Sequence, residues 1–347
     1  MDPMRVFAIL ALSWLLPQTA SAADMDRSVL QARCWSPAQL SGAPQEKKAL
    51  RGNRAFDTQP AITPLTQFEP VRQNLRGAIR RVKLPPGKKL IALTFDLWEL
   101  TGEVAGYDAA VFDTLRATGV RATIFAGGKW MRSHPERTRQ LMADPLFELA
   151  NHGDAHRNLR LLKGPAPAQE INGAQQTYET ARGTFAADQC VRGQEEAFAS
   201  IPERISLFRF PFGACNQPAL DAVNDAGLLA IQWDISTGDP FRGQSAQAIT
   251  AAMLRAKPGA IIIAHGNGRG FHTAEALSVA IPALKAKGFK FVTVSELLAQ
   301  GTPEISATCY NARPGDTDRY DTFFKPRLQK TARPPAETKN ERGPNPR

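Results

Sequence analysis

The sequence is poor in histidine and cysteine and, after its first 22 residues, lacks an apolar run long enough to cross a bilayer. Five histidines and four cysteines occur among its 347 residues. No G-x-G-x-x-G follows the first expected strand, which weakens a dinucleotide-binding interpretation. We find neither a nucleic-acid-binding motif nor an internal repeat. Hydrophobic residues make up 43% of the chain, so it can bury the core of one large domain or two small ones.

Residues 1–22 have the pattern of a secretory signal peptide. Arg5 supplies a positive charge, Val6 to Leu16 form an apolar run, and Ala20-Ser21-Ala22 fits a small-residue cleavage site. A membrane anchor is the alternative, but the run of about 11 apolar residues is short against the roughly 20 needed to span a bilayer. We therefore expect cleavage after Ala22 and an exported, soluble protein that is periplasmic or extracellular.

Export would place the four cysteines in a compartment where disulfides form. Cys34, Cys190, Cys215 and Cys309 allow three pairings. We favour Cys34–Cys309, which would tie the two ends of the mature domain, together with Cys190–Cys215. A catalytic cysteine is the alternative, but none of the four lies in a recognisable nucleophile motif.

The excess of positive charge is concentrated at the end of the chain. Seven Lys or Arg against two Glu follow Thr322, about half of the net charge of +10. Because this segment is also rich in proline and polar residues, we expect a disordered basic tail over residues 311–347. The tail could hold the protein near an anionic cell wall or membrane, or it could simply be solvated. We expect no nucleic-acid partner, and the oligomeric state stays open.

From Leu90 onwards, strand-like runs alternate with helical stretches. We expect strands at residues 90–95, 122–126, 146–151, 207–210, 228–235, 260–264 and 290–294. Helices are expected at residues 107–118, 135–142, 168–187, 217–226, 245–255, 273–287 and 295–300, with Asn216 and Ser245 as N-caps. Residues 23–88 are proline-rich with little periodicity, and we expect an irregular segment packed on the domain. The alternation predicts an α/β fold with seven parallel strands in a closed or nearly closed barrel; an open doubly wound sheet is the alternative.

Five of these apolar runs end in a polar residue fit for chemistry. They lead into Asp96, His152, Arg209, Asp234 and His265. Catalytic residues collect at the carboxyl ends of parallel strands, so five such endings predict one assembled active site.

The spacing of His152 and His156 allows two imidazoles to reach one metal ion, although two surface or capping histidines would give the same pattern. Asp96 could be a general base, a metal ligand or a helix N-cap. Glu99 could add a third ligand oxygen, as a water-activating metal needs about three protein ligands and one open position.

The other candidate residues point to carbonyl chemistry. Arg209 precedes Phe210-Pro211-Phe212-Gly213, a tight turn whose backbone N–H groups could face a developing oxyanion. Asp239 or Asp234 could pair with Arg209, in catalysis or in a purely structural salt bridge. His265 could be a general acid or a satisfied core histidine.

Over about residues 88–300 these motifs resemble those of the polysaccharide deacetylases, the NodB-homology carbohydrate esterases. The family motifs T-F-D-D-G, H-[ST]-x-x-H, R-x-P-[YF]-G, one ending in Asp-Trp, and L-x-H are similar, in this order, to Thr94–Glu99, His152–His156, Arg209–Gly213, Asp239–Pro240 and Ile263–His265. The resemblance implies a distorted (β/α)7 barrel, with the catalytic domain at residues 89–310. It also implies an acetylated polysaccharide as substrate.

Individual roles follow from the same resemblance. It implies that Asp96 is the general base, oriented by Arg209, which is itself steadied by Asp239. His152 and His156 would hold a divalent metal. The backbone N–H of Phe212 would stabilise the oxyanion, and His265 would be the general acid.

The sequence departs from the family pattern at four positions, one of which is Gly153 in place of the Ser or Thr of the second motif. Leu97 stands where the family has its metal-binding second Asp, Trp98 replaces the Gly, and Pro240 replaces the Trp. We expect Glu99 to supply the missing ligand. Histidine and carboxylate ligands suit zinc, although cobalt, nickel or manganese could also bind.

The leading functional hypothesis is therefore a metal-dependent hydrolase that removes acetyl groups from a cell-wall or extracellular polysaccharide. N-acetyl is favoured over O-acetyl. The first alternative is a non-catalytic carbohydrate-binding relative that has lost its metal site through Leu97. The second is an amide hydrolase with a non-sugar substrate.

Overall fold

The computed structural model describes residues 22–58, 61 and 68–322. The predicted signal peptide, apart from Ala22, lies outside the described residues, as does the predicted tail from residue 323. Within the described part of the chain, no helix is both long and apolar enough to cross a membrane.

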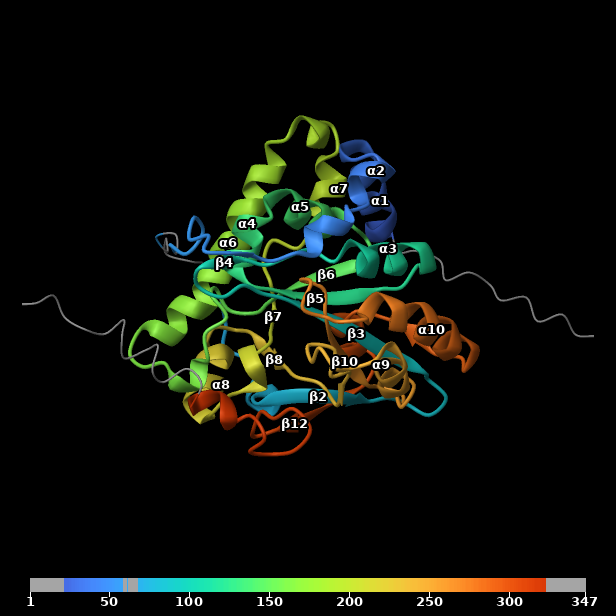
Figure 1. The fold of residues 1–347 in the computed structure, drawn as a ribbon. Helices are drawn as coiled ribbons and strands as arrows, with labels where there is room; N and C mark the ends of the chain where they lie inside the picture. Colours follow the sequence, from blue (N-terminus) through green and yellow to red (C-terminus); the bar gives the residue numbers. More distant parts are fainter. Residues whose placement is uncertain (1–21, 59–60, 62–67, 323–347) are drawn as a thin grey trace, which may run out of the picture.

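A curled, mostly parallel sheet of ten strands forms the centre of the molecule (Figure 1). Its path runs β12-β2-β8-β7-β6-β5-β3-β10-β9, and β11 pairs with β3 off this path. Only β12 is antiparallel to its neighbour. The bounds are β2 (Ala78–Lys83), β3 (Leu90–Leu97), β5 (Ala122–Ala126), β6 (Phe147–Asn151), β7 (Leu207–Phe208), β8 (Leu229–Ile231), β9 (Ile235–Ser236), β10 (Ile261–His265), β11 (Lys290–Phe291) and β12 (Thr302–Ser306).

The curl of the sheet confirms the predicted barrel-like α/β fold and excludes the open doubly wound alternative. An antiparallel bridge between Arg81 and Ala260 joins β2 to the start of β10, drawing two distant parts of the sheet path together. The runs Leu90–Phe95 and Ile261–Ala264 are almost wholly buried, as expected for strands covered on both faces.

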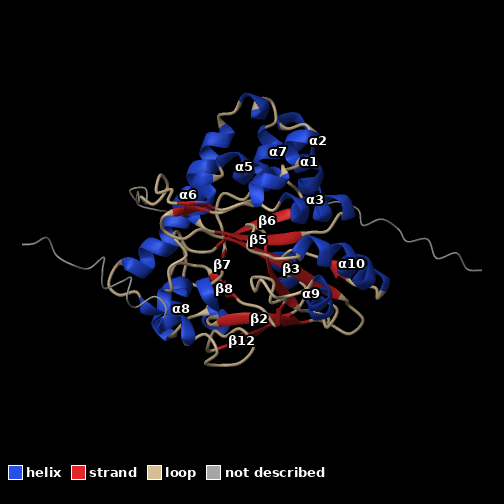
Figure 2. Ribbon diagram, in the orientation of Figure 1, coloured by secondary structure: helices blue, strands red, loops and turns tan. Residues whose placement is uncertain are grey.

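Helices surround the sheet (Figure 2). They are α3 (Ala109–Thr118), α4 (Gly128–Ser133), α5 (Pro135–Ala143), α6 (Ala166–Ala186), α7 (Glu195–Ala199), α8 (Gln217–Asp225), α9 (Ala246–Met253), α10 (Thr273–Ala286) and α11 (Val294–Leu298). The side chains of Asn216 and Ser245 accept hydrogen bonds from the backbone of Ala219 and Ala248, which confirms both predicted N-caps.

The expected strand 228–235 is divided in two. β8 stops at Ile231 and β9 begins at Ile235. The carbonyls of Ile231 and Gln232 accept hydrogen bonds from the side chain of Arg209 instead of from a neighbouring strand. The strand is therefore interrupted where Arg209 binds its backbone, and the apolar pattern of residues 228–235 gives no sign of that contact.

The N-terminal segment is more regular than predicted. It contains α1 (Ala22–Cys34), α2 (Pro37–Leu40), β1 (Leu50–Arg51) paired with β4 (Glu103–Val104), and β2. Leu30 is fully buried, and the guanidinium of Arg27 donates to the carbonyls of Pro145 and Phe147. This segment is therefore an integral layer of the fold and not an irregular covering.

The start of the predicted disordered tail is also ordered. Arg160 forms ion pairs with Asp318 and Asp321, and the indole of Trp233 donates to the side chain of Asn311. The prediction of disorder is thus wrong for residues 311–322.

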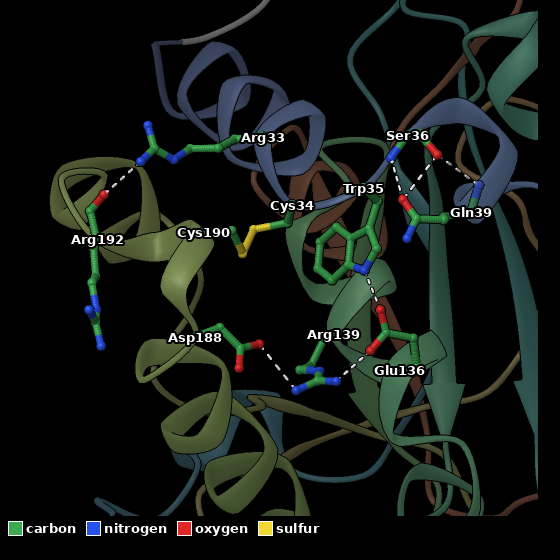
Figure 3. Close-up of a disulfide and its surroundings, with 10 residues drawn as sticks. All are labelled: Arg33, Cys34, Trp35, Ser36, Gln39, Glu136, Arg139, Asp188, Cys190 and Arg192. Atoms are coloured by element: carbon green, nitrogen blue, oxygen red, sulfur yellow. Dashed lines mark hydrogen bonds and ion pairs between the residues drawn. A yellow bond between two sulfur atoms is a disulfide. The ribbon is translucent and has the colours of Figure 1, made fainter.

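The predicted disulfide pairing is wrong. The structure joins Cys34 to Cys190 and Cys215 to Cys309, with Cα–Cα distances of 5.1 and 5.3 Å. α1 packs against α7 and against the turn Gln189–Val191, which brings Cys34 to Cys190 (Figure 3). Each end of the domain is therefore fastened to its interior and not to the other end.

Candidate active site

The carboxyl ends of the central strands lie in one row. The register pairs His265 with Asp96, Asp96 with Phe125, Ala126 with Asn151, and Asn151 with Phe208. The residues that follow Asn151 and Phe208 are His152 and Arg209. These residues therefore lie along one edge of the sheet, where strand-end reasoning expects them.

A buried ion pair lies at the centre of this row. Arg209 is fully buried, and its Nη1 donates to Asp96 Oδ1 at 2.8 Å and to Thr94 Oγ1 at 2.7 Å. Burial lowers the pKa of Arg209, an effect that the Asp96 carboxylate opposes. Its guanidinium also lies 3.9 Å from the ring centre of Phe125. These contacts fix one oxygen of Asp96.

The alternative partners considered for Arg209 are engaged elsewhere. Asp234 accepts from the backbone N–H of Ile261, at 2.9 Å, and lies 3.9 Å from Arg81. Asp239 bonds to His265. Asp96 alone is therefore the carboxylate partner of Arg209 among the described residues.

His152 is oriented by the same arginine. Its Nδ1 lies 2.9 Å from the backbone carbonyl of Arg209, an acceptor, so Nδ1 carries the proton and Nε2 the lone pair. Nε2 is buried without a hydrogen-bond partner in the described structure and lies 3.5 Å from Asp96 Oδ2. Burial lowers the pKa of His152, the Asp96 carboxylate opposing it, and keeps the imidazole neutral.

His156 completes the histidine pair. The centre of its ring lies 5.0 Å from that of His152. The ring stacks on Trp98, with 4.0 Å between ring centres, and packs edge to face with Phe212, with 4.3 Å between ring centres. Nδ1 is buried with no hydrogen-bond partner in the described structure, and burial lowers the pKa of the ring well below its usual value. Two neutral imidazoles thus present unpaired nitrogens in one buried place.

Glu99 is not brought to these histidines. Its Oε1 accepts from the backbone of Ala105 at 2.9 Å and from Ser133 Oγ at 2.6 Å, and it lies 3.6 Å from His134. Trp98 takes the position against His156, while Glu99 turns toward the end of α4. Burial raises the pKa of Glu99 to about 7. Across the described residues, no three His, Cys, Asp or Glu side chains gather closely enough to hold a metal ion.

The predicted general acid has a carboxylate partner. His265 Nδ1 lies 2.9 Å from Asp239 Oδ1, and its backbone N–H donates to Oδ2 at 2.8 Å. Burial lowers the pKa of His265, but the carboxylates of Asp239 and Asp96 together more than offset this and raise it. Thr237 and Thr273 donate one hydrogen bond each to Asp239. Neither threonine was predicted: Thr237 follows β9 and Thr273 begins α10, and no motif in the sequence relates either of them to Asp239.

The turn after Arg209 lies beside the histidine pair. Phe212 adopts a left-handed φ of 63°, as does His156 with a φ of 52°, and both are unusual for residues with a side chain. Gly213 also has a positive φ, and a Cβ there would come within 2.8 Å of Trp233. Two of the three non-glycine residues with a positive φ among the described residues thus lie beside the two imidazoles, and the third is His272 before α10.

Sequence reasoning also missed the aromatic cover of the site. Arg269 stacks over Trp98, 4.2 Å from the ring centre, and forms an ion pair with Glu103. The backbone carbonyl of Trp98 accepts from Asn267 at 2.7 Å. Trp98, which replaces the family's glycine, is thus held over His156 by contacts with Arg269 and Asn267.

Comparison with known proteins finds a matching family model and several relatives. The family model for polysaccharide deacetylase matches residues 83–231. The peptidoglycan-N-acetylglucosamine deacetylase PgdA of Listeria monocytogenes is 25% identical over 278 residues, 79% of this chain and 51% of PgdA. This chain therefore spans about half the length of that relative.

A shorter relative and a solved structure are also similar to this chain. A chitooligosaccharide deacetylase of Azorhizobium caulinodans is 27% identical over 219 residues, 60% of this chain and 93% of that protein. The crystal structure of the Bc1960 peptidoglycan N-acetylglucosamine deacetylase superposes with a TM-score of 0.53 at 22% identity, covering 66% of this chain and 96% of that one. At this identity the superposition supports the fold alone.

Proposed function

We propose that this chain, whose residues 83–231 match the family model for polysaccharide deacetylase, is a metal-dependent hydrolase that removes acetyl groups from a cell-wall or extracellular polysaccharide. The observation that carries the proposal is the buried Asp96–Arg209 pair beside two imidazoles with unpaired nitrogens. Two relatives are named as a peptidoglycan-N-acetylglucosamine deacetylase and a chitooligosaccharide deacetylase, and these names favour N-acetyl over O-acetyl groups as the target here.

The donor atoms fit a divalent cation in part. His152 and His156 offer two unpaired buried nitrogens, and Asp96 Oδ2 lies 3.5 Å from the first of them. We propose that the two histidines hold the ion, with zinc the first candidate for this ligand type. The ion would supply Lewis-acid polarisation of the acetyl carbonyl and an activated water. Glu99, turned toward Ser133, is a positioning residue of the α4 end in this proposal.

The remaining roles belong to the chain's own groups. Asp96 takes a proton from the attacking water, with Arg209 holding Oδ1 so that Oδ2 faces the histidines. The backbone N–H of Phe212 lies in the turn next to His156 and stabilises the oxyanion. His265, held at Nδ1 by Asp239, has Nε2 left to give a proton to the leaving amine. The two disulfides support an exported, periplasmic or extracellular location.

One observation favours a second candidate function. No third ligand accompanies the histidine pair among the described residues, as expected of a carbohydrate-binding relative without catalysis. Retention of the Asp96–Arg209 and Asp239–His265 pairs favours the enzyme, because a binding surface has no need of a buried proton-transfer set.

Metal content and acetate release together test the proposal. We expect about one divalent ion per purified wild-type chain, its loss in His152→Ala, and its retention in Glu99→Ala. Loss in Glu99→Ala would restore Glu99 as the third ligand. Asp96→Asn should keep the metal and lose acetate release from chitooligosaccharides and peptidoglycan fragments. Wild-type protein that binds no metal yet binds these glycans would support the non-catalytic function instead.

A further inference from the structure

Basic side chains gather at the end of the barrel where β3 begins. They lie on three connections, β2 to β3, α9 to β10, and α10 to β11, and on the ends of the elements that these connections join. Residues 83–90, 254–260 and 285–290 contain no Asp or Glu. We call this surface the basic end; its eight exposed cations are Lys83, Lys88, Lys89, Arg255, Lys257, Lys285, Lys287 and Lys290.

Hydrogen bonds hold the three connections side by side. The backbone N–H of Gly259 donates to Leu90 at 2.7 Å, and that of Lys290 donates to Lys89 at 2.9 Å. The ammonium of Lys89 donates to the carbonyl of Lys287 at 3.0 Å. These links place the cations on one contiguous surface.

The charges of the basic end are not compensated by the protein. Within the described residues, none of the eight side chains takes part in an ion pair. Glu296 lines the neighbouring hollow, but Arg121 engages it at 2.9 Å and it caps α11 through Thr293. A field of exposed like charges attracts anions over about a Debye length, roughly 8 Å at physiological salt.

We propose that the basic end binds the surface of an anionic phospholipid bilayer. The same hollow, of about 610 Å³, is lined by Lys88, Lys89 and Lys290 as well as by the Arg121-paired Glu296, and it can receive a phosphate headgroup. Seven of the eight cations are lysines, whose compact charges suit a diffuse layer of headgroups. The aromatic residue of these connections, Phe289, is half-buried against the core, so the surface has no platform for stacking nucleic-acid bases.

Binding through this end has a consequence for the candidate site. β3 starts at Leu90 in the basic end, and Asp96 lies near its other end. Six residues of strand separate them by about 20 Å. The site therefore opens away from the membrane, toward polymer outside it.

Co-sedimentation of the full chain with vesicles tests the proposal. Vesicles of equal parts phosphatidylglycerol and phosphatidylcholine should bind the protein, and vesicles of phosphatidylcholine alone should not. The variant Lys88→Gln/Lys89→Gln/Lys257→Gln/Lys290→Gln should bind at least about tenfold more weakly. Raising salt from about 0.15 M to about 0.5 M should release the wild type.

A matched variant removes the same amount of charge elsewhere. Lys48→Gln/Arg51→Gln/Lys163→Gln/Arg192→Gln changes four exposed cations outside the basic end, and it should bind like the wild type. All forms carry the same C-terminal tail, so tail-driven binding would leave both variants unaffected and overturn the proposal. Equal weakening of both variants, or binding to double-stranded DNA with none to vesicles, would also overturn it. Circular dichroism checks that each variant is folded.

Discussion

Replacing Arg209 by methionine tests whether the charge of buried Asp96 depends on Arg209 for its stabilisation. Arg209→Met keeps much of the volume of the side chain and removes its charge. Asp96 then stays in the interior, its side chain only 5% exposed, without a cation. Bonds to Thr94 and to the carbonyls of Ile231 and Gln232 are lost as well.

The expected cost is large because the remaining carboxylate is buried. Breaking a buried pair by removing one partner costs about 3–5 kcal/mol of unfolding free energy. Arg76→Met is a matched control, because Arg76 lies 2.8 Å from Asp225, whose side chain is 63% exposed. That change should cost about 1 kcal/mol or less. In Arg209→Met/Asp96→Asn, the neutral amide removes the unpaired charge, and we expect an interaction energy of roughly 2 kcal/mol.

The measurement is denaturant unfolding at neutral pH, followed by far-UV circular dichroism with the disulfides intact. Dialysis against a chelator beforehand removes any contribution from bound metal. Two results would refute the reasoning. One is a cost for Arg209→Met no greater than for Arg76→Met. The other is additivity of the two changes in the double variant, since partners in contact must couple.

Two further predictions concern pH. Asp239→Asn should lower the pKa of the His265 imidazole, followed by NMR titration, because Asp239 is the nearer of the two carboxylates that raise this pKa against the effect of burial. The stability that this pair adds is complete below the unfolded pKa and disappears as pH rises through the folded value, so wild type and variant should converge in alkali. The contribution of Glu99 to wild-type stability should fall as pH rises from about 4.5 to about 7, because this buried carboxyl group must ionise. Glu99→Gln should reduce that fall by at most about 3 kcal/mol, and parallel pH curves for the two proteins would contradict this reasoning.

Much of the barrel could be predicted because its strands are continuous apolar runs. Residues 122–126 form a strand as expected, and β3 and β10 differ from expectation by one or two residues at their ends. β2 escaped prediction because Arg80 and Arg81 interrupt its apolar pattern, and Arg80 is buried against the ring of Tyr310. Such burial depends on a partner far away in the chain.

The candidate site was predictable to the extent that its residues end strands. Asp96 and His265 are register partners, which strand-end reasoning predicts. The orientation of Glu99 depends on Ser133 and on the backbone of Ala105, and no spacing rule relates it to them. Disulfide pairing failed for a similar reason, because it depends on the docking of α1 against α7.

The two disulfides give the covalent chain a simple topology of consecutive rings. Residues 34–190 close the first ring and residues 215–309 the second. Asp96 and the histidine pair belong to the first ring, Asp239 and His265 to the second, and Arg209 to the open stretch between them. A single proteolytic cut inside either ring leaves the molecule in one piece, whereas a cut at residues 191–214 divides it into two closed fragments. In the oxidised, unfolded chain the two halves of the site are thus already sorted onto separate rings, and folding joins them through the segment that carries Arg209.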